Sequence, residues 1–215
     1  MTIKNFCLSL FILLSITTQA QDWSLDTYIY GEQYEGYIID NEGNKIEGFI
    51  KYRNRWVMQN EVIFYKKKDN TSTKTKYLVK DLVEYKVADK LYHCINYAGG
   101  KSIAKKGNLV INQEGCIKEY LWYDRASSYT KMKLRPGESS EELGNRKFPS
   151  TVVFYKKGDG MGVTKGFFKV DFTKKAKAYF SENKIIAKKI KTSAEGYTKP
   201  QHIPTIIKEY NESCK

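Results

Sequence analysis

The sequence predicts an α+β fold, in which an antiparallel β-rich body precedes a C-terminal element of about three short helices. Short runs of Val, Ile and aromatic residues follow one another along most of the chain, separated by charged or Gly-containing turns. No 10-to-15-residue helical pattern alternates with these runs, which disfavours a parallel α/β sheet. The apolar spacing becomes helical only near Val170. We therefore expect a barrel- or sandwich-like body with a helical tail.

The first strands form a predicted hairpin over residues 34–51. Two β-rich runs flank a turn at residues 41–44, whose sequence is Asn-Glu-Gly-Asn. Gly36 and Gly48 occupy matching places in these runs, and glycine within a strand marks a bulge or a close backbone approach. The hairpin therefore predicts a curved sheet.

Further strands are expected where short apolar runs recur along the chain. They are Glu61–Lys67, Lys76–Val79, Val83–Val87, Leu91–Tyr97, Leu109–Ile111, Ile117–Tyr123 and Tyr129–Leu134. Residues 136–145 carry Gly, Ser and Glu and are expected to form an exposed loop. The glycines at 158, 160 and 162 lack the spacing of a phosphate-binding loop, so a flexible hairpin loop is expected there.

The tail carries helical stripes of apolar residues. They are Phe172, Ala176, Tyr179 and Phe180; Ile185, Ile186 and Ile190; and Ile203, Ile206, Ile207 and Tyr210. Pro204 suits the first turn of the last helix. We expect this element, residues 171–215, to pack on a β-rich domain at residues 21–170.

The first 20 residues have the features of a secretory signal peptide. Lys4 precedes an uncharged apolar run from Phe6 to Ile16, and Ala20 is a small residue at the expected cleavage point. The run is too short to cross a bilayer, and no other stretch of sequence is long enough to form a transmembrane span. We expect an exported protein, periplasmic or secreted.

The chain is basic, with a formal net charge of +13, or +12 without residues 1–20. Lysine supplies 32 of the 37 basic residues, and lysine lacks the planar fork with which arginine contacts phosphates and bases. The lysines are spread along the whole chain rather than clustered with stacking aromatics, which argues against nucleic-acid binding. An anionic envelope component or a protein partner is the expected partner.

The cysteines outside the signal peptide are Cys94, Cys116 and Cys214, an odd number for an oxidising compartment. A disulfide between Cys94 and Cys116, on neighbouring strands, would leave Cys214 outside it. The alternative is that the cysteines stay reduced and pack as small apolar side chains.

Short segments distributed along the chain resemble a group of exported Bacteroidota proteins of unknown function. They are the Thr-Gln-Ala-Gln end of the signal, the 36–38 and 48–50 pair, the 77–85 segment, and the Tyr-Phe-Ser at 179–181 with Tyr-Asn at 210–211. The resemblance implies an envelope or secreted setting and carries no known activity.

Most catalytic and metal-binding motifs lack a part in this sequence. His93 and His202 are the two histidines, and neither belongs to a zinc-type spacing, so neither a metal nor a cofactor is expected. A Cys116–His pair lacks a third group to orient it. The carboxylates Asp40, Glu84, Glu119 and Asp124 lie on or near predicted strands, where two of them could serve a hydrolase.

Trp56, Trp122 and Tyr123 are candidate ligand-binding residues, although core packing is the simpler role for them. We expect a non-enzymatic envelope or secreted protein that binds a partner through its sheet surface. The alternative is a carboxylate-dependent extracytoplasmic hydrolase acting on an envelope or glycan substrate. A pocket that joins two carboxylates beside a tryptophan would favour the hydrolase, whereas dispersed carboxylates would favour binding.

Overall fold

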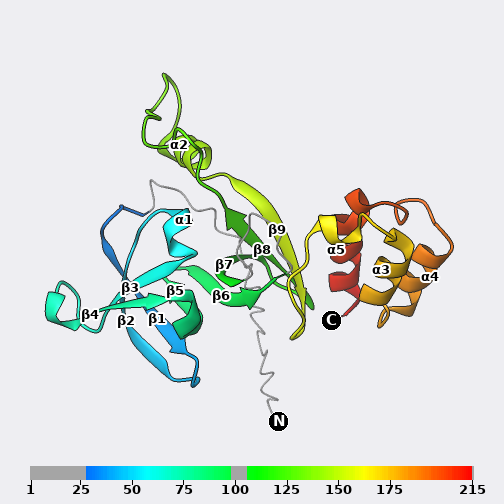
Figure 1. The fold of residues 1–215 in the computed structure, drawn as a ribbon, viewed down its shortest axis with the longest axis horizontal. Coiled ribbons are helices and arrows are strands. Elements are labelled where there is room, and N and C mark those ends of the chain that lie inside the picture. The colour runs from blue at the N-terminus through cyan, green and yellow to red at the C-terminus, as the bar shows by residue number, and fades with distance from the viewer. Residues whose placement is uncertain (1–27, 98–105, 215) are drawn as a thin grey trace, which may run out of the picture.

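The computed structural model describes residues 28–97 and 106–214, so the predicted signal peptide lies outside the described residues. One open, nine-stranded antiparallel sheet is followed by C-terminal helices, which lie at one end of the long axis of the molecule (Figure 1). The predicted α+β class is confirmed. The described strands form a single sheet with two edges, β4 and β9, rather than a closed barrel or two stacked sheets.

The strands are β1 (Gln33–Asp40), β2 (Lys45–Lys51), β3 (Glu61–Tyr65), β4 (Lys74–Leu78), β5 (Leu82–Val87), β6 (Lys90–Asn96), β7 (Lys106–Gln113), β8 (Ile117–Tyr123) and β9 (Ser150–Lys157). The helices are α1 (Arg55–Met58), α2 (Ser140–Lys147), α3 (Phe172–Tyr179), α4 (Lys184–Lys191) and α5 (Ile203–Ser213). Short 3-10 turns are η1 (Thr71–Thr73), η2 (Val79–Asp81), η3 (Lys165–Phe168) and η4 (Pro200–His202). The strand order is β4-β3-β2-β1-β5-β6-β7-β8-β9.

The two hairpin glycines lie where neighbouring backbone approaches closely. Gly36 and Gly48 are partners across β1 and β2. A Cβ on Gly36 would overlap the carbonyl of Lys86, and one on Gly48 would lie 2.5 Å from both the Phe64 ring and the Tyr65 carbonyl. Only residues without a Cβ allow this packing, as the sequence predicted.

Two expectations for residues 129–145 are wrong. Residues 129–134 form turns and irregular chain rather than a strand, and Tyr129 packs against Phe148. No edge of β8 is open to such a strand, because β8 pairs with β7 on one side and β9 on the other. Part of the predicted loop at 136–145 is helical, because Ser139 and Glu142 form a capping box that begins α2.

The hairpin loop expected around residues 158–162 is present. The backbone groups of Tyr155 and Val163 exchange two hydrogen bonds, of 2.7 and 2.9 Å, across this loop. The three predicted tail helices are likewise confirmed as α3, α4 and α5. In the described ranges, none of the helices is long and apolar enough to cross a membrane.

The helical tail shares a core with the sheet. Ile117 of β8 and Tyr155 of β9 pack in one buried cluster with residues of α3, α4 and α5. A second cluster includes Ile38, Ile50 and Tyr85 and reaches Val110 of β7 and Tyr123 of β8. We call the side of the sheet that carries Ile38, Ile50 and Tyr85 the core face, and the opposite side, which carries Tyr37, Phe49 and Glu84, the outer face.

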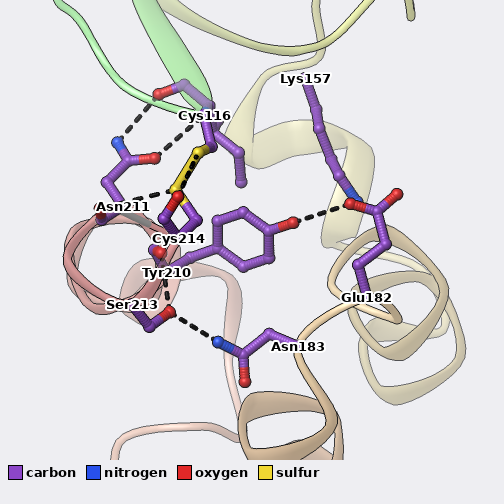
Figure 2. The surroundings of a disulfide bond; sticks show 9 residues. Cys116, Lys157, Glu182, Asn183, Tyr210, Asn211, Ser213 and Cys214 are labelled. Atoms are coloured by element: carbon purple, nitrogen blue, oxygen red, sulfur yellow. Dashed lines mark hydrogen bonds and ion pairs between the residues drawn. A yellow bond between two sulfur atoms is a disulfide. The ribbon is translucent and has the colours of Figure 1, made fainter.

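A disulfide fastens the end of α5 to the start of β8 (Figure 2). It joins Cys116 to Cys214, with Cα atoms 6.5 Å apart, and leaves Cys94 as a free thiol. The predicted Cys94–Cys116 pairing is therefore wrong. Cys94 lies on β6, its Sγ 3.2 Å from the Val79 carbonyl oxygen, whereas Cys116 lies in the turn before β8, where α5 ends.

Two primary amides complete the backbone hydrogen bonding of β8. The Asn211 side chain accepts a hydrogen bond from the backbone nitrogen of Ile117 and donates one to its carbonyl, both at 2.9 Å (Figure 2). At the other end of the strand, Gln59 makes the same pair of bonds with Tyr123, at 2.5 and 2.8 Å. Each amide replaces a neighbouring strand where the ladder ends, so helices α5 and α1 are held against the sheet.

Candidate functional site: the outer face of the sheet

The four candidate carboxylates are dispersed. Asp40 accepts hydrogen bonds from the turn at Glu42 and Asn44, and Asp124 bonds to the backbone nitrogen of Arg125. Glu119 bonds to Asn112, while Glu84 contacts Tyr37 and His93. No hydrogen bond or shared partner joins any two of them within the described residues. The two-carboxylate geometry of a glycosidase is not assembled from these groups.

The three candidate aromatic residues do not form one platform. Trp122 and Tyr123 are buried in different core clusters, because successive residues of β8 point to opposite faces. Trp56 lies on α1, half-buried, with the Arg125 guanidinium 4.7 Å from its ring centroid. Core packing thus accounts for Trp122 and Tyr123.

A row of polar side chains crosses the outer face instead. The Tyr37 hydroxyl of β1 donates a 2.6 Å hydrogen bond to Glu84 of β5. The other Glu84 oxygen lies 3.1 Å from Nε2 of His93 on β6, and Nδ1 of His93 lies 2.8 Å from the Tyr120 hydroxyl of β8. These four residues are called the His93 row below.

Burial controls the protonation of the row. It lowers the pKa of His93, an effect that outweighs the opposing attraction of Glu84. The imidazole is therefore neutral near pH 7. Because the Glu84 carboxylate oxygens accept hydrogen bonds, Nε2 carries the hydrogen and Nδ1 accepts from the Tyr120 hydroxyl. Burial, followed by the hydrogen bond to Glu84, raises the pKa of Tyr37 to about 12.

The row has the order carboxylate, imidazole, hydroxyl, which also occurs in hydrolytic triads. Its hydroxyl, however, belongs to Tyr120, whose side chain is only 1% exposed. Burial also raises the pKa of Tyr120. A phenol that is both enclosed and held in its protonated form does not meet a substrate in solution. The row consequently acts as a fixed hydrogen-bond network that orients Tyr37 at its exposed end.

Tyr37 also lines a shallow hollow in the outer face. The hollow extends over β1, β2 and the end of β5, and it is lined by Glu35, Gly36, Tyr37, Glu47, Gly48, Phe49, Lys86 and Ala88. Tyr37 and Phe49 supply aromatic surface, whereas Glu35, Glu47 and Lys86 place charges of both signs around it. The Lys45 ammonium lies 4.4 Å from the centroid of the Tyr37 ring and covers one of its faces. We call this feature the sheet hollow.

The local sequence explains why the hollow forms. Within β1 and β2, the residues beside the glycines alternate between the two faces. Ile38 and Ile50 enter the core, while Tyr37 and Phe49 remain half-buried on the outer face. The missing side chains of Gly36 and Gly48 let the neighbouring backbone close in from the core side. The hollow on the outer face lies over these two glycines.

Neither cysteines nor histidines form a reactive pair or a metal site in the described part of the chain. His93 and Cys94 point to opposite faces of β6, and burial raises the pKa of the Cys94 thiol. Cys116 is held in the disulfide. Nδ1 of His202 lies 3.3 Å from the backbone nitrogen of Thr198. Among the described residues, no group of three His, Cys, Asp or Glu side chains is arranged to hold a metal ion.

Sequence reasoning selected Glu84 but missed the other members of the site. Tyr37, His93 and Tyr120 come from three strands that are distant in sequence, and only the strand order brings them into one row. The sole local signal was the repeat of an aromatic residue after each hairpin glycine, which marks Tyr37 and Phe49.

Comparisons of this chain with protein-family models, with curated proteins and with solved structures find no match. The resemblance to exported Bacteroidota proteins therefore remains a prediction.

Proposed function

We propose that this chain is an exported, non-enzymatic protein of the cell envelope that binds a protein partner through the sheet hollow. The observation that carries the proposal is the hollow itself, an aromatic surface with charges of both signs on an open sheet face. Interfaces use aromatic side chains as anchors and polar groups at the rim for specificity. The dispersal of the candidate carboxylates supports binding over hydrolysis.

The mixed charge at the hollow favours a protein over a purely anionic polymer. Glu35 and Glu47 would repel a polyanion, whereas a polypeptide offers both signs of charge. The His93 row supports this use, because it fixes the Tyr37 hydroxyl and so reduces the conformational entropy lost on binding. Two features support export. One is the predicted signal peptide. The other is the Cys116–Cys214 disulfide, because disulfides form and persist in oxidising compartments outside the cytoplasm.

To test this proposal, the chain without residues 1–20 is immobilised and incubated with envelope extract. Bound species are identified by mass spectrometry, and amide hydrogen exchange on the complex locates the contact. We expect one species to be retained and the protection from exchange to fall on β1, β2 and β5. A Phe49→Ala, Lys86→Glu variant should retain at least tenfold less of that species.

The matched control changes an equivalent pair of residues far from the hollow. Leu134→Ala with Lys131→Glu makes the same types of substitution on an exposed segment, so it should bind as the unmodified protein does. Thermal melts of both variants verify that each remains folded. Equal retention by both variants, or protection confined to another surface, would contradict the proposal.

A further inference from the structure

Two of the tail helices belong to a strongly basic segment. Residues 165–199 contain ten lysines and only three acidic residues. They include α3 and α4, which lie at the end of the long axis remote from β1 to β5 (Figure 1). This concentration of charge is separate from the sheet hollow.

Helical geometry places five of these lysines on outward faces. In α4, Ile186 and Ile190 are buried, and Lys184, Lys188 and Lys191 recur at i, i+4 and i+7 on the opposite side. In α3, Phe172 and Ala176 are buried, and two lysines lie opposite them. We call the five residues the lysine face: Lys174, Lys177, Lys184, Lys188 and Lys191.

The fold gives partners to Lys175 and Lys189, which flank the core, but no carboxylate partner to the lysine face. Lys189 lies 2.7 Å from Glu209 and 3.1 Å from the Tyr197 hydroxyl. Lys175 donates to the Phe167 carbonyl and lies over its ring. In contrast, no carboxylate of the described residues lies within ion-pair distance of any member of the lysine face. Like charges at i, i+4 destabilise a helix, so an external anion would relieve this repulsion.

An apolar side chain stands beside the lysine stripe. Ile185 precedes the buried Ile186 and is 68% exposed, the largest exposed fraction among the big hydrophobic residues described. On the helical wheel it lies about 60° from Lys188 and about 100° from both Lys184 and Ile186, so it borders the lysine stripe. Basic residues around a protruding apolar group are typical of helices that lie in a membrane interface, where lysine stems extend toward the headgroups.

We infer that the lysine face docks on the surface of an anionic phospholipid bilayer, with Ile185 entering the headgroup region. Charge complementarity carries the inference. Lysine suits this role because it acts as a hydrated point charge and needs no fixed geometry in the ligand. Ile185 distinguishes a bilayer from a soluble polyanion, since only the bilayer receives an apolar side chain. The inference is independent of the proposed function, because the sheet hollow plays no part in it.

To test the inference, the chain without residues 1–20 is mixed with lipid vesicles, and the protein that sediments with them is measured. The vesicles contain either phosphatidylcholine alone or phosphatidylcholine with about a third phosphatidylglycerol. We expect binding only to the anionic vesicles, with strong weakening as salt is raised and the charges are screened. Each basic residue near an anionic surface contributes about fivefold in affinity, so a Lys184→Gln, Lys188→Gln, Lys191→Gln variant should bind about a hundredfold more weakly.

A triple variant at the end of β3 is the matched control. Lys66→Gln, Lys67→Gln, Lys68→Gln removes the same charge from another exposed lysine cluster and should leave most binding intact. Ile185→Ser should weaken binding to vesicles severalfold and leave binding to soluble polyphosphate unchanged. If the two triple variants lost vesicle affinity equally, binding would depend on net charge alone, and the inference would be overturned. An unchanged affinity of Ile185→Ser for vesicles, or binding to polyphosphate only, would also overturn it.

Discussion

Single amide side chains hold the two ends of β8 in place. Asn211 is only 8% exposed and Gln59 is fully buried, yet both satisfy backbone groups that the sheet leaves unpaired. Gly115 makes room for Asn211, because a Cβ there would lie 2.5 Å from the Asn211 amide nitrogen. An amide suits these positions because it donates and accepts at once, as a peptide group does.

Replacing Asn211 by Ala should lower the free energy of unfolding by about 1–3 kcal/mol. The backbone nitrogen and carbonyl of Ile117 would be left without partners in a buried site. Urea denaturation measures the change. Glu212→Ala, at the exposed neighbouring position, should alter stability by no more than about 0.5 kcal/mol. An Asn211→Ala change as small as that of Glu212→Ala would mean that the Asn211 bonds do not stabilise β8.

His93 should make the protein less stable at mildly acidic pH. Glu84, Glu114, Lys118 and Lys156 act on it electrostatically, and burial is the largest effect and lowers its pKa. An unfolded histidine titrates near pH 6.5. Between the folded-state pKa and about 6.5, the unfolded chain binds more protons, so stability falls as pH drops through this window.

A His93→Gln variant should therefore lose less stability than the unmodified protein between pH 7.5 and 5.5. Urea midpoints across this range measure the difference, and His202 serves as an internal control because it is present in both proteins. The carboxylates whose pKa is lowered by hydrogen bonding, such as Asp40 and Glu61, act below this range. Identical pH profiles for the two proteins would contradict the assignment to His93.

At the scale of elements, the disulfide joins the last helix to the sheet. It closes a loop between residues 98 positions apart, and a cross-link of that span restricts the unfolded chain strongly. Changing both Cys116 and Cys214 to Ser should lower the free energy of unfolding by about 2–5 kcal/mol. Alkylation before reduction, followed by peptide mass spectrometry, should label Cys94 and neither Cys116 nor Cys214. Labelling of either bridged cysteine in the purified protein would contradict the bridge.

The tail helices could be predicted from sequence because their signal is local. The apolar stripe of each helix repeats every three to four residues within the helix itself, and the observed α3, α4 and α5 coincide with the three stripes, except that Ile185 of the middle stripe is exposed. The disulfide could not be predicted in the same way. Its partners depend on where α5 ends relative to β8, which is a matter of tertiary packing. The strand predicted at 129–134 is absent for a related reason. Strand β8 pairs with β7 on one side and with β9 on the other, so no edge of β8 is open to a further strand.

At the scale of the whole molecule, the class of fold was predictable but the sheet order was not. Strands β5 to β9 are neighbours in sequence and in space, as sequential strands commonly are. The β1–β2 hairpin instead places β1 beside β5, and β3 and β4 continue beyond β2 to form the opposite edge. This placement brings Tyr37 next to Glu84 and so assembles the His93 row. The candidate site therefore depends on the part of the topology that no local pattern encodes.

The tail is an integral part of this architecture, and truncation after Lys169 should yield aggregated protein. Removing the helices would expose Ile117, Tyr155 and Val163, which now share a buried cluster with α3, α4 and α5. It would also remove Asn211 and the ion pair between Lys157 and Glu182, 2.9 Å long (Figure 2). Isolated helices of 8 to 11 residues are marginal in water, so sheet and helices depend on each other for their burial.

Size-exclusion chromatography with light scattering separates the effect of losing the packed tail helices from the effect of losing the Cys116–Cys214 disulfide. The full-length double Cys→Ser variant lacks the bridge but keeps the helices, and it should remain monomeric with a lowered melting temperature. The truncated chain should instead elute as aggregates, because an exposed apolar sheet surface promotes association. If the truncated chain were monomeric with an unchanged melting temperature, the shared cluster would contribute nothing to stability, and the tail would have to be regarded as a separate folding unit.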